Sequence, residues 1–249
     1  MKCYVILPCY NEEQNLKTLI PRINATLKPK MPYTIIAIND GSTDNTSHLL
    51  RALSKEYPII IIEHPQNKGL GETLKDGLTT AAQLSTAEDL IITMDADNTH
   101  DPRYMLDMTK NTCQADIVIA SRYVKGGKQL NVPPHRVILS KVINQAIKFV
   151  TRIPIKDATS GYRCFKAKTI KTLHKQLGKK LIESKGFETS LEILLKLSWL
   201  NPAIHEIPIT LNYAKKTGHS KMKLTPTIQR YITLLFTTNK WKNQLKKPT

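Results

Sequence analysis

The sequence predicts an α/β protein built on a Rossmann-like, mostly parallel, doubly wound sheet, and three observations lead to this fold class. Several short runs are apolar and β-branched without polar alternation, which is typical of strands buried on both faces. Stretches with helical spacing separate these runs, so strand and helix alternate along the chain. Polar motifs follow the runs, as expected where ligands bind beyond the carboxyl ends of parallel strands. The expected strands are residues 3–7, 33–39, 59–63, 90–94 and 116–120.

Helical patterns fill the gaps between these strands. Apolar residues from Leu16 to Leu27 recur at helical spacing, although Pro21 is expected to kink or restart this helix because proline lacks an amide hydrogen. Asp44 supplies a carboxylate suited to the N-terminus of the next helix. The expected helices are residues 16–27, 44–56, 69–84 and 102–111.

The regular alternation fades after Arg122. Residues 124–136 have the Gly, Pro and basic content of a mobile loop, and Gly126 and Gly127 would let this loop move over a bound substrate like a lid. The remaining expectations are an amphipathic helix over 137–152, a turn over 156–165, a helix over 188–197, a strand around 203–211 and a basic tail.

Composition limits the possible functions. The chain has 249 residues, 41% of them hydrophobic, and its 37 Lys and Arg against 20 Asp and Glu give a formal charge of +17, which favours anionic partners. The four cysteines have neither C-x-x-C nor zinc-ligand spacing, so a reduced compartment is expected. There is no signal-peptide pattern and no apolar run near the roughly 20 residues of a membrane span. We therefore expect a cytoplasmic protein, soluble or peripheral on the cytoplasmic face of a membrane.

Three carboxylates follow the expected strand 90–94, in the stretch from Asp95 to Asp101. Two carboxylates at D-x-D spacing repel each other unless a cation lies between them, and Mg²⁺ and Mn²⁺ prefer carboxylate oxygens. We therefore expect Asp95 and Asp97 to bind such a cation, which could also hold a substrate diphosphate. Asp101 is expected to cap the helix that begins near Pro102.

Further motifs accompany this acidic pair, in the order ILPCYNEEQNL, INDGSTDNT, NKGLG, MDADNTHDP, SRY and SGYRCFK. Together they resemble the inverting family 2 glycosyltransferases, and most closely the group of dolichyl-phosphate or polyprenyl-phosphate mannose synthases. The resemblance implies a glycosyltransferase A fold with C-terminal helices on the acceptor side. It also implies a nucleotide-sugar donor and a Mg²⁺ or Mn²⁺ cofactor.

The resemblance also assigns binding roles to individual residues. Ala96 would contact metal and diphosphate together with the two aspartates beside it. Thr99 stands where the mannose synthases have a glutamine that faces the metal, and its hydroxyl would replace that glutamine as a metal contact, directly or through water. Arg122 matches a position that contacts the donor phosphate, which suits its planar pair of donors. Gly41 is expected only to form a turn. The nucleoside would lie against Pro8, Tyr10, Glu12 and Asp40, and the diphosphate would be covered by Lys221 and by Lys215 or Lys216.

Catalysis is expected from Asp97, Arg122 and Asp157. Positive charge would stabilise the leaving diphosphate while an acceptor oxygen attacks the anomeric carbon from the opposite face. A lipid phosphate needs no general base, whereas a hydroxyl does. Asp157 and Glu188 are the candidates for such a base or for positioning the acceptor, although Asp157 could instead cap Thr159 or Ser160, and Glu188 could begin a helix. A phosphate acceptor would be met by Arg136, Arg163, Lys125 and Lys128.

The C-terminal segment adds a possible membrane contact. We interpret residues 1–223 as the catalytic domain and residues 224–249 as an amphipathic, basic helix and tail. Many family relatives carry transmembrane helices after this point, and this chain has none, so membrane contact would depend on the helix, the basic surface or a separate membrane subunit. Packing of the helix on the core is the alternative. The apolar positions are Ile228, Ile232, Leu235 and Phe236, with Tyr231 and Trp241 nearby.

The expected reaction is metal-dependent, inverting transfer of a sugar, with GDP-mannose as donor and polyprenyl or dolichyl phosphate as acceptor. The alternative within this class is transfer from a UDP-sugar to a hydroxyl of a saccharide or glycolipid. A nucleotidyltransferase should carry a Gly-rich phosphate loop directly after the first strand, and PCYNEE is not one. Nucleic acid is not an expected partner, because the sequence has no helix-turn-helix, zinc or RNP signature.

Overall fold

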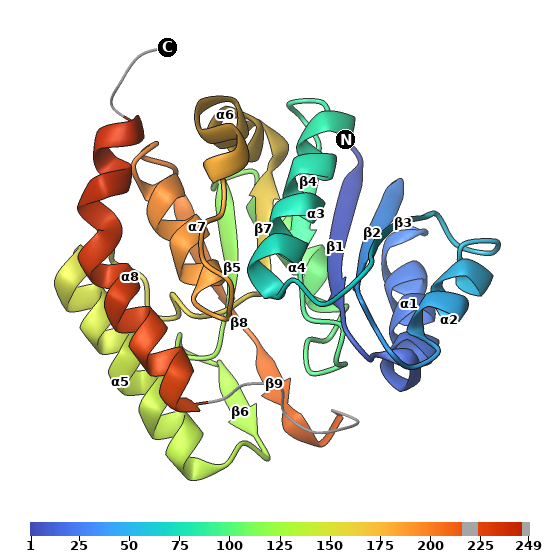
Figure 1. Ribbon diagram of the computed structural model, residues 1–249, viewed down its shortest axis with the longest axis horizontal. Helices are drawn as coiled ribbons and strands as arrows, with labels where there is room; N and C mark the ends of the chain where they lie inside the picture. Colours follow the sequence, from blue (N-terminus) through green and yellow to red (C-terminus); the bar gives the residue numbers. More distant parts are fainter. Residues whose placement is uncertain (216–223, 246–249) are drawn as a thin grey trace.

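The computed structural model of the chain describes residues 1–215 and 224–245. Within these residues, a seven-stranded sheet with the order β3-β2-β1-β4-β7-β5-β8 crosses the molecule (Figure 1). Neighbouring strands are parallel except at β7, which runs antiparallel to both β4 and β5. The predicted mostly parallel sheet is therefore confirmed. Its strands are β1 (Cys3–Cys9), β2 (Tyr33–Asp40), β3 (Ile59–His64), β4 (Leu90–Thr93), β5 (Ile117–Ser121), β7 (Arg163–Lys166) and β8 (Ile204–Pro208).

Three short strands differ from the expectation. The prediction of a turn over 156–165 is wrong for its last three residues, because β7 begins at Arg163. This strand inserts between β4 and β5, where Cys164 lies opposite both Ile92 and Val118. The predicted loop 124–136 contains β6 (Lys128–Leu130), which pairs in parallel with β9 (Thr210–Asn212). The single strand predicted over 203–211 is divided after Pro208 into β8 and β9. Strands this short carry too few residues for an apolar pattern to be recognised.

The helices lie close to the predicted ranges, and one was not predicted. Pro21 lies inside α1, which continues through it, so the expected restart does not occur. Asp44 accepts a hydrogen bond from the Thr46 amide at the start of α2, at 3.0 Å. The α-helices are α1 (Glu13–Leu27), α2 (Thr46–Leu53), α3 (Leu70–Leu84), α4 (Tyr104–Asn111), α5 (Pro134–Thr151), the unpredicted α6 (Ala167–Leu177), α7 (Thr189–Ser198) and α8 (Leu224–Leu245); short 3₁₀ turns span Gly178–Lys180 and Tyr213–Lys215.

Each face of the sheet has its own apolar core, because successive side chains of a strand point to opposite faces. Tyr4 and Ile6 of β1 pack with α3, α6 and α7. Cys3, Val5 and Leu7 pack with α1, α2 and α4 on the other face. α5 and α8 lie side by side beyond α7 at one end of the molecule (Figure 1). The doubly wound arrangement leaves the carboxyl ends of the parallel strands as one continuous edge.

A buried ion pair ties α7 and α8 to the segment before α7. Lys196 and Glu192 are both fully buried in α7, with Nζ and Oε1 2.5 Å apart. Lys196 also donates to the Lys180 carbonyl at 2.7 Å and lies 4.7 Å from the ring centre of Trp241 on α8. Glu192 accepts the backbone amides of residues 183 and 184, each at 2.8 Å. The segment 181–188 is therefore fixed to both helices.

Replacing Lys196 by Ala should lower the free energy of unfolding by about 3–5 kcal/mol, because Glu192 would remain as an unpaired buried charge. Urea denaturation followed by circular dichroism would measure the change. Lys17→Ala is the matched control: its partner Glu13 lies on the surface of α1, where water screens the pair, so the loss should be far smaller. Equal effects of the two substitutions would contradict this account of the buried pair.

Candidate active site

The turn after β4 is fastened to α1. β4 ends at Thr93, and Asp95 and Asp97 follow at its carboxyl end. Asn98 has a φ of 63°, in the left-handed region that asparagine tolerates. Its side-chain amide donates to the carbonyl and the side-chain oxygen of Asn15, both at 3.1 Å, and to Thr18 Oγ1 at 3.0 Å. These bonds determine where both carboxylates lie relative to the sheet.

Hydrogen bonds within the turn orient the two carboxylates differently. Thr99 donates to Asp97 Oδ1 twice, from its amide at 3.1 Å and from its hydroxyl at 2.6 Å. The backbone amide of Asp95 donates to His100 Nδ1 at 3.1 Å, and the Asp95 side chain is 46% exposed. Asp101 accepts the Arg103 amide at 3.1 Å ahead of α4, close to the predicted cap. Asp97 is thus held in one orientation, whereas the Asp95 side chain is partly exposed and its Oδ2 lies 4.0 Å from His100 Nδ1.

The two aspartates fit a divalent cation that shares its ligands with substrate. Within residues 1–215 and 224–245, no three His, Cys, Asp or Glu side chains gather as an all-protein cage. Mg²⁺ is commonly bound by one or two carboxylates together with substrate phosphates and water. This turn supplies the two carboxylates, and the remaining ligands would come from substrate and water. The Thr99 hydroxyl donates to Asp97, so the structure gives it an orienting contact, and direct contact of Thr99 with the metal stays a prediction.

A cavity of about 540 Å³ lies over the carboxyl ends of β1, β2 and β4. Asp95, Ala96 and Asp97 form the part of its lining that follows β4. The predicted nucleoside contacts Pro8, Tyr10, Glu12 and Asp40 all line it, together with Asn67, Lys185, Phe187 and Arg230, which were not predicted. The sequence therefore predicted the residues that line this cavity after β1, β2 and β4. It did not predict the residues contributed by the segment before α7 and by α8.

Asp40 organises the wall of this cavity. Its carboxylate accepts the amides of Lys68 and Gly69, both at 2.9 Å, and contacts His64 Nδ1 at 2.6 Å. The side chain is buried, so these bonds fix the loop before α3. Gly41 follows with a φ of 66°, and a Cβ there would lie 2.3 Å from the backbone of Gln66, in agreement with its predicted turn role. A direct contact of Asp40 with the nucleoside stays a prediction.

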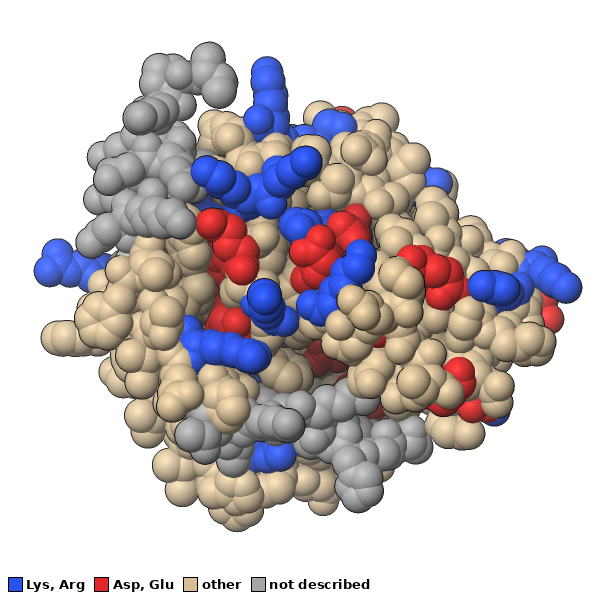
Figure 2. Space-filling view, viewed as in Figure 1, with Lys and Arg blue, Asp and Glu red and all other residues tan. Residues whose placement is uncertain are grey.

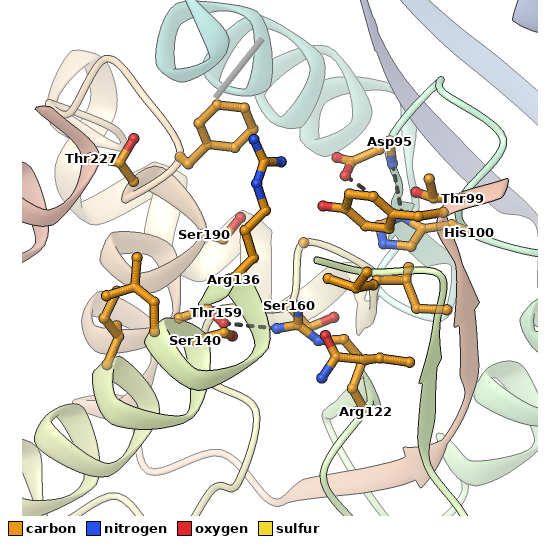
Figure 3. Close-up of a pocket in the computed structure, with 18 of the residues that line it drawn as sticks. Asp95, Thr99, His100, Arg122, Arg136, Ser140, Thr159, Ser160, Ser190 and Thr227 are labelled. Atoms are coloured by element: carbon orange, nitrogen blue, oxygen red, sulfur yellow. Dashed lines mark hydrogen bonds and ion pairs between the residues drawn. The ribbon is translucent and has the colours of Figure 1, made fainter. Parts of the chain in front are cut away.

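A second cavity, of about 170 Å³, meets the first at Asp95 and Asp97. Arg122 reaches it from the end of β5, and Arg136 extends from α5 toward the side on which Asp95 and His100 lie (Figure 3). Ser140 lies one turn further along α5. Two guanidinium groups therefore face the acidic turn across a small, partly enclosed space.

Asp157 is the buried partner of Arg122. Its carboxylate accepts Arg122 Nε at 2.7 Å, Nη2 at 2.6 Å and the Arg122 amide at 2.9 Å. Burial alone would lower the pKa of the Arg122 guanidinium, but the Asp157 carboxylate outweighs it and raises that pKa. Asp157 is fully buried and lines neither cavity, so the geometry favours positioning of Arg122 over direct proton transfer.

Several predicted contacts lie elsewhere. The prediction that Arg163 binds the acceptor phosphate is wrong, because its buried guanidinium donates to the carbonyls of Ala158 and Ser190 and lines neither cavity. Burial lowers the pKa of this guanidinium to about 10. Glu188 is buried directly before α7, and its carboxylate accepts a hydrogen bond from the Gly186 amide at 3.0 Å. This position agrees with the alternative that Glu188 begins a helix. Lys125 and Lys128 also line neither cavity. The Lys215 side chain, Lys216 and Lys221 lie outside the described part of the structure.

The basic excess is unevenly distributed. On the face seen in Figure 2, Lys and Arg side chains surround a group of acidic side chains near the middle of the view. The formal charge of the whole chain is +17, so the long-range field should attract anionic substrates while local carboxylates remain available to a cation.

The sheet order, the cavity beyond its carboxyl edge and the acidic pair after β4 define a glycosyltransferase A fold. Residues 4–173 match the description Glycosyl transferase family 2. The chain belongs to this family, and it is a glycosyltransferase.

Known proteins resemble the chain in sequence and in structure. A dolichol-phosphate mannosyltransferase of Pyrococcus furiosus is 31% identical over 99% of this chain, which spans 66% of the length of that relative. An undecaprenyl-phosphate mannosyltransferase of Micrococcus luteus is 30% identical over 89% of this chain and 88% of its own length. A crystal structure of glucosyl-3-phosphoglycerate synthase from Mycobacterium tuberculosis, in complex with Mn²⁺, UDP and glucosyl-3-phosphoglycerate, superposes with a TM-score of 0.63. The superposition covers 100% of this chain and 81% of the synthase chain, at 16% sequence identity, so this likeness concerns the fold alone.

Thr99→Val should weaken binding of a Mn²⁺–nucleotide complex about three- to tenfold, because Asp97 would lose the hydroxyl donor that orients it. Isothermal titration with Mn²⁺ and GDP or UDP would measure this change. Thr26→Val on α1 removes a comparable hydroxyl bond away from both cavities and serves as the control. Unchanged nucleotide affinity in Thr99→Val would mean that this contact does not support metal binding.

Proposed function

We propose that the protein transfers mannose from GDP-mannose to a polyprenyl or dolichyl phosphate, with inversion at the anomeric carbon and with Mg²⁺ or Mn²⁺. The charge of the second cavity is the observation that carries this proposal. Among the described residues, Arg122 and Arg136 line the cavity, and its only carboxylates are those of Asp95 and Asp97. An anionic acceptor needs no general base, and this cavity offers two guanidinium groups but no separate carboxylate to serve as one.

The first cavity suits the nucleotide part of the donor. Tyr10 offers an aromatic face to a base, and Glu12 lies beside it as a hydrogen-bond acceptor. A donor lying there with its diphosphate at Asp95 and Asp97 would have its sugar at the junction of the two cavities. Lys185 and Arg230 on the opposite wall supply positive charge for the diphosphate.

The chain's own residues would then align the two reactants. Arg136 and Ser140 lie one helical turn apart on α5, so both would contact the acceptor phosphate from the same side. The phosphate oxygen would attack the anomeric carbon on the face opposite the donor diphosphate, whose bond to that carbon breaks as the new bond forms. Arg122, held by Asp157, would stabilise the charge on the departing diphosphate. A divalent cation bound by Asp95 and Asp97 would neutralise part of that charge.

The outer surfaces of α5 and α8 support contact with a membrane, where a polyprenyl phosphate resides. Phe149 on α5 and Phe236 on α8 are 85% and 83% exposed, and Ile138, Val142, Val150 and Ile232 are also exposed. The sequences of the two helices contain Lys and Arg but neither Asp nor Glu. Exposed apolar side chains on helices whose own charged residues are all positive suit an anionic lipid interface. Within the described residues, no helix is both long enough and apolar enough to cross a bilayer.

A transfer assay tests the proposed reaction. Incubation with Mn²⁺, GDP-mannose and a short polyprenyl phosphate should give a mannosyl phosphoglycolipid detectable by mass spectrometry, and Asp95→Ala with Asp97→Ala should abolish it. Arg136→Ala should raise the KM for the lipid phosphate about tenfold or more while leaving Mn²⁺–GDP affinity within about twofold. Arg51→Ala, an exposed arginine on α2, is the control. Sugar transfer only to saccharide or glycolipid hydroxyls would overturn the lipid-phosphate assignment.

Membrane contact has a separate test. The double substitution Phe149→Ser and Phe236→Ser should reduce cosedimentation with protein-free vesicles of phosphatidylcholine and phosphatidylglycerol by about tenfold or more, because burying each phenylalanine contributes about 1.5–3 kcal/mol. Leu84→Ser changes an exposed apolar residue at the end of α3, away from these helices, and should have little effect. If the unchanged protein does not bind such vesicles, a separate membrane subunit becomes the better explanation of this surface.

A further inference from the structure

His100 lies in the turn that carries the two aspartates and has so far received no role. Its side chain is mostly buried, yet it lines the second cavity. In Figure 3 it lies beside Asp95 and Thr99 on the wall opposite Arg136. Its position at the acidic turn and at the acceptor side of the site makes both of its ring nitrogens relevant.

The Asp95 backbone determines the protonation of one nitrogen. The Asp95 amide donates to His100 Nδ1 at 3.1 Å, and a backbone amide can only donate. Nδ1 must therefore be the acceptor and carry no proton. In the neutral ring the proton is then on Nε2, which becomes a hydrogen-bond donor.

Stacking fixes the direction of the ring. The rings of His100 and Tyr162 lie 4.9 Å apart between centres, with 23° between their planes. Tyr162 is fully buried, and its hydroxyl donates to the Asp101 carbonyl at 3.0 Å, so the stacking partner is itself tied to the turn. The imidazole is held between the Asp95 amide and this ring, which leaves Nε2 little freedom to turn away.

The charges around the second cavity indicate what Nε2 would bind. Among the described residues, no protein group accepts a hydrogen bond from Nε2. The cavity also holds the guanidinium groups of Arg122 and Arg136, which favour an anionic oxygen. We infer that His100 positions Asp95 through Nδ1 and donates from Nε2 to a phosphate oxygen in the second cavity. This inference rests on the proposed function, and the oxygen could belong to the acceptor phosphate or to the donor diphosphate.

Two substitutions separate the roles of the two nitrogens. The side-chain oxygen of asparagine can take the place of Nδ1 but reaches no further, whereas the amide of glutamine can take the place of Nε2. His100→Asn should lower kcat/KM about tenfold, because one bond to a charged oxygen is lost. Its Mn²⁺–GDP affinity should stay within about twofold if that oxygen belongs to the acceptor phosphate, and should fall if it belongs to the donor diphosphate, which GDP also carries. His100→Gln should weaken Mn²⁺–GDP binding about three- to tenfold while leaving GDP affinity without Mn²⁺ unchanged. His48→Asn on α2 is the control, and circular dichroism would verify folding.

The kinetic constants identify the source of the oxygen. A higher KM for the polyprenyl phosphate in His100→Asn would assign it to the acceptor, and a lower kcat with unchanged KM would assign it to the leaving diphosphate. Both results support the inference. Identical behaviour of His100→Asn and His100→Gln in nucleotide binding and in turnover would overturn it.

Nuclear magnetic resonance tests the tautomer without any substrate. Long-range proton–nitrogen correlation spectra of the folded protein, with His100 assigned by the signals missing in His100→Asn, should show that the neutral ring carries its proton on Nε2 and none on Nδ1. A proton on Nδ1 would overturn the positioning role. A wild-type protein that transfers no sugar would overturn the proposed function, whereas the tautomer and the Mn²⁺ dependence of GDP binding would still decide whether His100 supports Asp95.

Discussion

The active site depends on holding two mutually repelling carboxylates in one short turn. The β4 ladder ends at Thr93, and beyond it the Met94 amide donates to the Ile6 carbonyl at 3.3 Å, so pairing with β1 holds the chain only as far as the start of the turn. The turn is instead held by Asn98 against α1, by Thr99 on Asp97 and by His100 on the Asp95 amide. All of these bonds join protein groups, so none of them needs a cation or a substrate as a partner. The fold itself therefore holds the two carboxylates close together, in an arrangement that is preorganised for a cation.

The antiparallel strand β7 brings one part of the wall of the second cavity into place. Because β7 inserts between β4 and β5, the segment that leads into it passes directly over the carboxyl ends of both. Gly161 accepts a hydrogen bond from the Thr93 hydroxyl, and Ser160 donates to the Ala120 carbonyl, both at 2.8 Å. The same segment carries Asp157 to Arg122. A strand running against its neighbours thus brings the residues before it to the edge where parallel strands present their ligands.

Sequence patterns predicted the parts of the fold and site that depend on local chemistry. Continuous apolar runs marked β1, β2, β4 and β5, and the polar motifs after them marked the edge that binds ligands. The strand β7 was not predicted because it is short and begins with Arg163, a residue whose burial no local sequence pattern indicates. Arg122 and Asp157 were each recognised, but their pairing was not, because 35 residues separate them. His100 stood within a recognised motif, yet only its contacts with the Asp95 amide and with Tyr162 give it a role.

α8 has two surfaces with different neighbours. Thr227 lines both cavities, and Ile228, Arg230 and Tyr231 each line one of them. Tyr231 donates to the Phe187 carbonyl at 3.1 Å, and Trp241 donates to Glu183 at 2.6 Å, so the helix is also bonded to the segment before α7. Thermodynamic linkage is reciprocal. If binding of substrate in the cavities shifts α8, the binding free energy of a partner on the outer side of α8 changes by the coupling free energy. Binding of that partner then changes the substrate affinity by the same amount.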